Sequence, residues 1–228
     1  MLPMNGETNR GKISESLGIA VLLALSGGFQ DAYTFLCRDG VFANAQTGNI
    51  VLMSAHLFRG EWAAAGRYVI PLSAYLLGTA AAEVIFFRFE KSRNLHWQQW
   101  VLLIEMFGLA AVGWIPDSLN PIANALVSFV CAMQVQAFHT MHGQSYASTM
   151  CIGNLRSGAE ALCRYARTGK RSFLRTAGIY GTVVLFFALG AGIGSVLTEI
   201  WGLKSIWVCP LFLFAAFGLL FMEEQEKK

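Results

Sequence analysis

The chain has 228 residues and a mass of 25.0 kDa, with 55% hydrophobic and only 14% charged residues. A soluble domain carries about 25% charged residues, so this chain lacks the polar surface that a water-soluble fold needs. The formal net charge of +3 gives no reason to expect a nucleic-acid partner. Composition therefore excludes a disordered or collagen-like chain and predicts an all-α integral membrane protein.

Six apolar stretches are long enough to cross a bilayer, for which a helix needs about 20 residues. Interfacial tryptophans mark several of their ends, including Trp97, Trp114 and Trp201. We expect the six to form a single membrane domain over residues 1–228. In chain order the predicted spans are Ser16–Leu36, Tyr68–Phe89, Trp97–Ile115, Asn120–Met141, Phe173–Leu197 and Leu203–Met222.

Two further segments, Phe42–Phe58 and Ala147–Cys163, look helical in their C-terminal halves but are too polar to face lipid. Irregular polar backbone survives at membrane depth only where it is buried in protein or lines a watery cavity. We therefore predict two re-entrant or broken half-helices beside the six spans. If both segments crossed instead, the chain would have eight spans, and charge alone does not exclude this alternative.

The distribution of basic residues predicts the orientation. With six spans, 13 of the 17 Lys and Arg residues fall on the side that holds both termini. By the positive-inside rule, both termini are expected in the cytoplasm. The loop Arg164–Arg175 carries five of these charges and no acid, which predicts anionic membrane lipid as a partner.

The order of long span, polar half-helix, long span, long span occurs twice, over residues of about 16–115 and about 120–222. A shift of 105 residues aligns Gly48-Asn49 with Gly153-Asn154, and Tyr75 with Tyr180. With three spans in each half, the second half enters the membrane from the opposite side. The sequence thus predicts two inverted three-span repeats, the plan of many secondary transporters.

Two motifs carry a family resemblance. Ser26-Gly27-Gly28-Phe29-Gln30-Asp31-Ala32-Tyr33 is followed by Val41-Phe42-Ala43-Asn44-Ala45-Gln46-Thr47-Gly48-Asn49, and the second half has Gln134-Val135-Gln136-Ala137-Phe138 and Ser148 to Ser157. Over nearly its whole length the chain resembles the YoaK family of bacterial membrane proteins. The resemblance implies a multi-pass protein of the inner membrane, but no substrate or activity. The family usually has Thr before the second Gly-Asn, where this chain has Ile152.

The candidate site centres on the two Gly-Asn pairs. Glycine lets the helix break and expose backbone groups, and asparagine supplies both a donor and an acceptor. The alternative is that each asparagine caps its broken helix or ties the two halves together. The candidate substrate-binding residues here are Asn44, Gln46, Thr47, Gly48, Asn49, Gln136, Gly153 and Asn154.

Two acids complete the candidate set. Asp31 lies towards the outer end of the first span, where it could relay a proton or hold a cation, with Arg38 or Arg67 as its partner. Alternatively it is an interfacial acid bonded to hydroxyls or to a helix end. Glu105 lies in the middle of the third span and is either a protonatable coupling residue or a neutral carboxyl bonded to a neighbouring helix.

For the remaining polar residues and for one pair of glycines, we predict structural roles. Arg156 and Glu160, four apart, are predicted to pair, and Glu83 is expected to pair with Arg88 or Lys91. His139 and His142 have no third metal ligand nearby in the sequence. Gly190 and Gly194 form a small-xxx-small pair, which predicts close helix packing.

The sequence contains no nucleophile–base set, Walker loop or HExxH motif, so we expect no enzymatic activity and no cofactor. The sequence favours a permease for a small molecule or ion, with its site where Thr47–Asn49 and Gly153–Asn154 approach each other. The alternative function is a non-transporting scaffold or sensor that binds lipid or protein partners.

Overall fold

The computed structural model describes residues 16–90, 95–141, 144–146 and 148–225, and nearly all of them are helical. The α-helices of this part are α1 (Leu17–Cys37), α2 (Gln46–Phe58), α3 (Trp62–Phe89), α4 (Trp97–Val112), α5 (Asn120–Ala137), α6 (Cys151–Thr168), α7 (Arg171–Trp201) and α8 (Cys209–Gln225). Two 3-10 helices, η2 (Asp117–Leu119) and η3 (Gly202–Val208), precede α5 and α8. The antiparallel strands β1 (Thr140–Met141) and β2 (Gln144–Ser145) follow α5. Apart from this short strand pair, the prediction of an all-α fold is confirmed.

Four stretches of the described chain are long and apolar enough to cross a membrane: Leu17–Cys37, Trp62–Phe89, Asp117–Ala137 and Arg171–Met222. The last has 52 residues and contains both α7 and α8, which η3 separates. Helix α4 is apolar but has only 16 residues. At 1.5 Å per residue it is about 24 Å long, somewhat less than the hydrocarbon core of a bilayer. Length and composition together support a membrane protein.

Among the predicted boundaries, the starts of α3 and α8 move most, by six residues each. Helix α3 begins at Trp62, six residues before the predicted Tyr68, and Ala65 N–H already donates to the carbonyl oxygen of Glu61 at 3.0 Å. Helix α8 begins at Cys209, because residues 203–208 wind into the tighter η3. Gly202, with φ of +55°, ends α7 at this point and lets the chain reverse.

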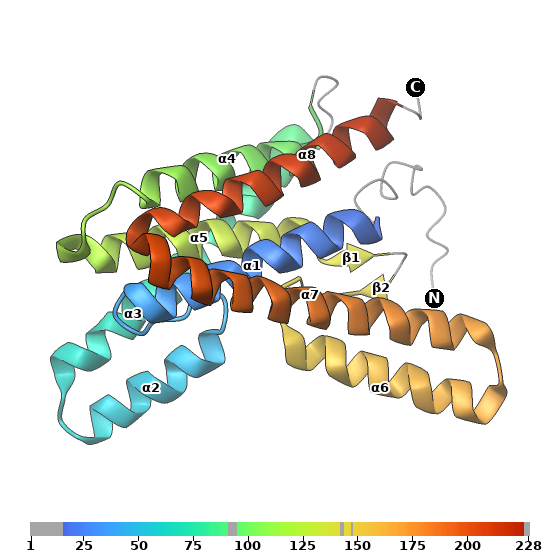
Figure 1. Cartoon of the computed structure of the whole chain (residues 1–228), viewed down its shortest axis with the longest axis horizontal. Helices are drawn as coiled ribbons and strands as arrows, with labels where there is room; N and C mark the ends of the chain where they lie inside the picture. The colour runs from blue at the N-terminus through green and yellow to red at the C-terminus, as the bar shows by residue number, and fades with distance from the viewer. Residues whose placement is uncertain (1–15, 91–94, 142–143, 147, 226–228) are drawn as a thin grey trace.

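The long helices alternate in direction along the bundle. In Figure 1, α1, α4 and α7 run from right to left, and α3, α5 and α8 run from left to right. The two polar segments form α2 and α6, which start near the middle of the molecule and run towards opposite ends (Figure 1). Each folds back on the next helix through a glycine with positive φ, Gly60 before α3 and Gly169 before α7.

Close packing joins the two halves of the chain. The most extensive helix contacts are those of α1 with α7 and of α3 with α5, whereas α4 covers α5 and α8 covers α1. A Cβ atom at Gly190 would lie 2.1 Å from the carbonyl oxygen of Leu25, and one at Gly194 would lie 2.9 Å from Cα of Phe29. The predicted packing role of this glycine pair is confirmed. On the other pair of helices, a Cβ at Gly78 would lie 2.1 Å from the carbonyl oxygen of Phe129.

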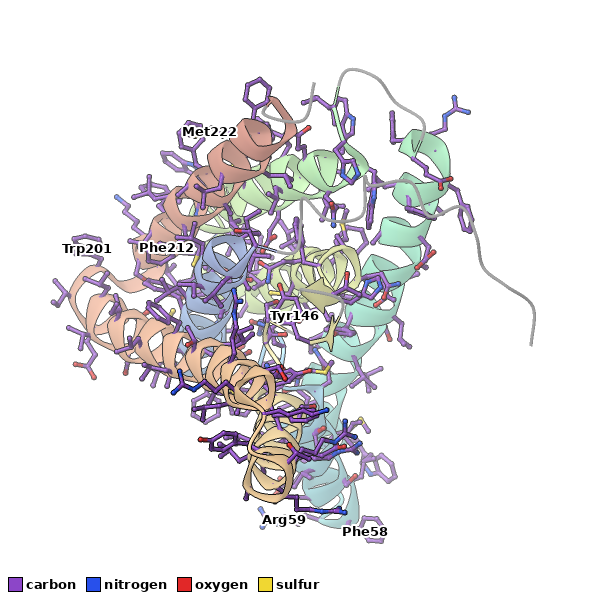
Figure 2. The ribbon with its side chains drawn as sticks, turned by 90° about the vertical axis from the view of Figure 1, so that its right-hand side faces the viewer. Phe58, Arg59, Tyr146, Trp201, Phe212 and Met222 are labelled. Atoms are coloured by element: carbon purple, nitrogen blue, oxygen red, sulfur yellow. The ribbon has the colours of Figure 1, made fainter. Side chains whose placement is uncertain are left out.

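Large apolar side chains cover the outside of the bundle. Figure 2 shows Phe58, Trp201 and Met222 at the periphery, and Phe58 is 95% exposed. Further exposed apolar residues lie along α3, α7 and α8, among them Leu76, Phe87, Leu185, Leu211 and Phe214. Such a continuous apolar exterior is typical of a surface that contacts lipid rather than water.

Candidate functional site

A cavity of about 1120 Å³ lies where the N-terminal ends of α2 and α6 converge on α1. It is lined from five helices and from the segments that lead into α2 and α6. The lining residues are Asp31, Ala32, Phe35 and Leu36 of α1; Phe42, Asn44 and Ala45; Gln46, Thr47 and Ile50 of α2; Leu72, Tyr75 and Leu76 of α3; Thr149 and Met150; Cys151, Ile152 and Gly153 of α6; and Phe187, Ala191, Gly192 and Ser195 of α7.

The structure brings together five of the ten candidate site residues. Asp31, Asn44, Gln46, Thr47 and Gly153 all line this cavity. The N-terminal turns of the two half-helices are therefore neighbours in space, although more than 100 residues separate them in the chain. The other candidates do not line it; these are Gly48, Asn49, Glu105, Gln136 and Asn154.

The cavity has a polar floor and an apolar rim. Asp31, Asn44 and Thr149 are all buried, each with less than a tenth of its surface exposed. At the rim, by contrast, Ile152 is 83% exposed and Leu76 is 68% exposed. The rings of Phe35 and Phe42 stack at 4.6 Å between centroids on one wall. A molecule with a polar head and an apolar body matches this arrangement.

Asp31 connects α1 to the start of α2. Its Oδ1 accepts a hydrogen bond of 2.7 Å from the backbone N–H of Asn44, and Asn44 Nδ2 donates to the carbonyl oxygen of Gly27 at 3.3 Å. The predicted partner Arg38 is not involved, and Arg67 is exposed on α3. The prediction of an Arg38 partner is therefore wrong, because the guanidinium of Arg38 is used elsewhere.

Asn49 braces the irregular segment before its own helix. Its Nδ2 donates to the carbonyl oxygen of Phe42 at 2.7 Å, and its Oδ1 accepts from Phe42 N–H at 3.0 Å. Asn49 Nδ2 also donates to Gln46 Oε1 at 2.9 Å. Gly48 leaves room for the Phe42 ring, since a Cβ there would lie 3.0 Å from Phe42 Cδ2. Of the two interpretations of this asparagine, these contacts favour the structural one.

The second Gly-Asn pair differs from the first. Gly153 lies on the cavity wall, and a Cβ atom there would meet nothing within 4 Å. Asn154 is buried, and its N–H donates to the carbonyl oxygen of Met150 at 3.4 Å. The glycine of this pair therefore faces the cavity, whereas that of the first pair packs against an aromatic ring.

Glu105 lies at the centre of a buried hydrogen-bond network away from the cavity. It is fully buried and accepts from Gln30 Nε2 at 3.1 Å. With its amide oriented to donate, Gln134 also reaches Glu105 Oε1 at 3.0 Å and accepts from Ser148 Oγ at 3.0 Å. Cys131 Sγ donates to the side-chain oxygen of Gln30. The network ties α1, α4 and α5 together.

Arg38 is a buried anchor that the sequence analysis did not identify. Its guanidinium donates to the carbonyl oxygens of Val112 at 3.0 Å and Ile115 at 2.9 Å, just where α4 ends. It also donates to Asn120 Oδ1 at 2.8 Å and to the Tyr33 hydroxyl at 3.0 Å. A cation that bonds the last carbonyls of a helix stabilises its C-terminus. An arginine directly after an apolar span was the signal that could have revealed this role.

Among the described residues, neither Glu160 nor Glu83 has the partner that the sequence predicted. Glu160 pairs with Arg164 at 2.6 Å rather than with Arg156, so that prediction is wrong. Both pairings have the four-residue spacing that places side chains on one helix face, so spacing alone could not choose between them. Glu83 accepts from Gln136 Nε2 rather than from Arg88, and Lys91 lies outside the described residues.

No cluster suited to a metal ion is present among the described residues. His139 Nδ1 lies 2.7 Å from the carbonyl oxygen of Gln136, and His142 lies outside the described part of the chain.

Comparison with known proteins places the chain in a family without assigning it an activity. The sequence model of the family described as "Protein of unknown function (DUF1275)" matches residues 19–219. No curated protein and no solved structure matches the chain. The match covers both half-helices and all the apolar helices except the ends of the first and last, and it agrees with the resemblance to the YoaK family. The chain belongs to the DUF1275 family.

Proposed function

We propose that this protein is a permease for a small molecule or ion, with its binding site in the cavity between α2 and α6. One observation carries the proposal: the N-terminal turns of two polar half-helices, from opposite halves of the chain, line one cavity with a buried acid on its floor. Sites of this kind, at discontinuous helices near the midplane, are characteristic of secondary transporters. The function requires binding and release, without covalent chemistry.

The proposal includes six spans, formed by α1, α3, α4, α5, α7 and α8, in two inverted repeats. The packing supports this symmetry. The inverted repeat matches α1 with α5, α2 with α6, α3 with α7 and α4 with α8. Under this matching, the contact of α1 with α7 corresponds to that of α5 with α3, and the contact of α2 with α3 corresponds to that of α6 with α7. Likewise, α4 on α5 becomes α8 on α1. The opposite courses of α2 and α6 from the middle of the molecule fit the same inverted relation (Figure 1).

The proposed location is the inner membrane, with both termini in the cytoplasm. Support comes from the excess of basic residues on that side and from the alternating helix directions, which put the start of α1 and the end of α8 at the same end of the bundle.

Thiol accessibility tests the proposal without knowledge of the substrate. Cys151 lines the cavity, whereas Cys131 and Cys209 are buried. A Cys37→Ala/Cys163→Ala variant therefore reports on the cavity through Cys151. In right-side-out and inverted vesicles, we expect a membrane-impermeant thiol reagent to label Cys151 from both sides, because a permease exposes its site alternately.

The matched control is Cys37→Ala/Cys151→Ala, which retains the exposed Cys163 at the end of α6. This variant should be labelled from the cytoplasmic side only. If Cys151 is also labelled from one side only, the permease is contradicted and the scaffold or sensor function is favoured.

A further inference from the structure

The polar floor of the cavity holds one carboxyl group beside amide and hydroxyl groups, among them Asn44 and Thr149. Among the described residues that line it, Asp31 alone is charged. Neither of the two ion pairs in the described part of the chain involves Asp31. The hydrogen bond of 2.7 Å from Asn44 N–H stabilises the carboxylate form of Asp31. The floor thus holds a buried carboxyl group that lacks a cationic partner among the described residues.

A second acceptor lies beside this carboxylate. The side-chain oxygen of Asn44 is buried and has no hydrogen-bond partner among the described residues. A buried polar atom without a partner is costly, and a bound donor would remove that cost. Two acceptors at one place match a ligand head that donates hydrogen bonds or carries positive charge.

The walls above the floor suit an apolar body. Phe35, Phe42, Tyr75 and Phe187 contribute aromatic rings, and Leu72 and Leu76 contribute aliphatic surface. Aromatic faces attract cations as well as apolar groups. The volume of about 1120 Å³ exceeds what a metal ion or a proton path requires and fits an organic molecule.

We infer that the cavity takes a small monovalent organic cation with an apolar body, its positive head at Asp31 and its body between the aromatic walls. The inference rests on the proposed function, because it names the substrate class of the same site. Helix N-termini attract anions, but at α2 the carboxylate of Asp31 already accepts a bond from the backbone leading into the helix. An anion held at the start of α6 is therefore the competing outcome.

The test compares three ligands that share one apolar body: phenylpropylammonium, phenylpropanol and phenylbutyrate. Their binding to the full chain in phosphatidylcholine nanodiscs is measured by titration calorimetry. We expect the ammonium compound to bind at least about tenfold more tightly than the alcohol, because truncating either partner of a buried charge contact strongly weakens binding. Tighter binding of the carboxylate, or equal affinity for all three, would overturn the inference.

Asp31→Asn isolates the charge, since the amide oxygen can still accept the hydrogen bond from Asn44 N–H. The ammonium preference should disappear in this variant, while the affinity for phenylpropanol stays unchanged and reports an intact cavity. Asp117→Asn, at an exposed acid of η2 outside the cavity, should leave all three affinities unchanged. An ammonium preference that survives Asp31→Asn contradicts the proposed head position.

The two proposals fail in different ways. If Cys151 is labelled from both sides but the ammonium compound is not preferred, the permease proposal stands and the inferred substrate class is wrong. If the ammonium compound is preferred but Cys151 is labelled from one side only, the inferred ligand class stands and the proposed transport function is wrong.

Discussion

At the scale of single residues, the buried polar groups of this protein mainly hold helices in place. Asn49 bonds both backbone groups of Phe42 in the segment before α2, and Arg38 bonds two carbonyl oxygens where α4 ends. The hydrogen bonds of Glu105 come from two glutamines, whose side chains carry no charge. Within a membrane, polar groups must find partners inside the protein. The type of residue therefore indicates that a polar contact exists, but not which partner provides it.

Replacing Arg38 tests its role as an anchor. Arg38→Met removes the donors to two carbonyl oxygens at the end of α4 and to Asn120 Oδ1. The Val112 oxygen keeps its bond from Ile115 N–H, but the Ile115 oxygen and Asn120 Oδ1 lose the donor that the arginine supplies. We expect the free energy of unfolding to fall by more than about 2 kcal/mol, measured as a lower melting temperature in detergent. Arg67→Met, at an exposed arginine of α3, is the matched control and should change little. Equal effects of the two variants would contradict the anchor role.

At the scale of helices, glycine positions decide which pairs approach closely. Gly28 and Gly190 bring α1 and α7 together, and Gly78 does the same for α3 and α5. These two contacts connect the first half of the chain to the second and position the walls of the cavity. The packing of the bundle therefore depends on the absence of side chains at a few positions.

Adding one methyl group at such a position should separate the helices. In Gly190→Ala the new Cβ would lie 2.1 Å from the carbonyl oxygen of Leu25, so we expect a loss of about 1–3 kcal/mol and a lower melting temperature. Gly181→Ala on the same helix meets nothing within 4 Å. That control should be neutral or slightly stabilising, by up to about 1 kcal/mol, because alanine favours the helix. Tolerance of Gly190→Ala would contradict the close packing.

Helix α6 has the features of a segment at a lipid surface. Ile152, Leu155 and Leu162 are exposed on it, and basic residues follow towards α7. We expect nanodiscs containing phosphatidylglycerol to raise the melting temperature relative to phosphatidylcholine alone. Arg167→Gln/Arg171→Gln should reduce this difference, since each basic residue near an anionic surface contributes about 1 kcal/mol.

The control for this lipid effect is Lys204→Gln, at an exposed lysine of η3 on the opposite side in the six-span arrangement. Because both leaflets of the nanodisc contain phosphatidylglycerol, this single variant should lower the lipid dependence, but by less than the double variant does. A lipid dependence that is the same in the wild type and in the double variant would contradict a headgroup contact at this segment.

At the scale of the whole molecule, six and eight spans make opposite predictions for the turn between α4 and α5. Six spans place Ser118 on the outer side of the membrane, whereas eight spans place it in the cytoplasm. Ser118 is exposed in η2, so Ser118→Cys should react with an impermeant thiol reagent. We expect labelling in intact cells, with Cys37, Cys151 and Cys163 replaced by alanine. Labelling confined to inverted vesicles would contradict six spans.

Composition and local pattern were enough to predict the all-helical class, the family, the membrane character and the two polar half-helices. These follow from composition and from the length of apolar runs, which depend on local order along the chain. The close packing of Gly190 against a neighbouring helix could also be predicted, because small residues four positions apart in a membrane helix usually lie at a helix–helix contact.

Which polar residues share one cavity could be seen only once the helices were packed together. Asp31 and Gly153 line the same cavity. Glu105 and Asn49 do not line it and instead make hydrogen bonds that support the helices. The tertiary structure also joined Arg38 to the end of α4 and Glu160 to Arg164. The physical reason is that a hydrogen bond needs donor and acceptor within about 3 Å, and helix packing, rather than residue type, sets these distances.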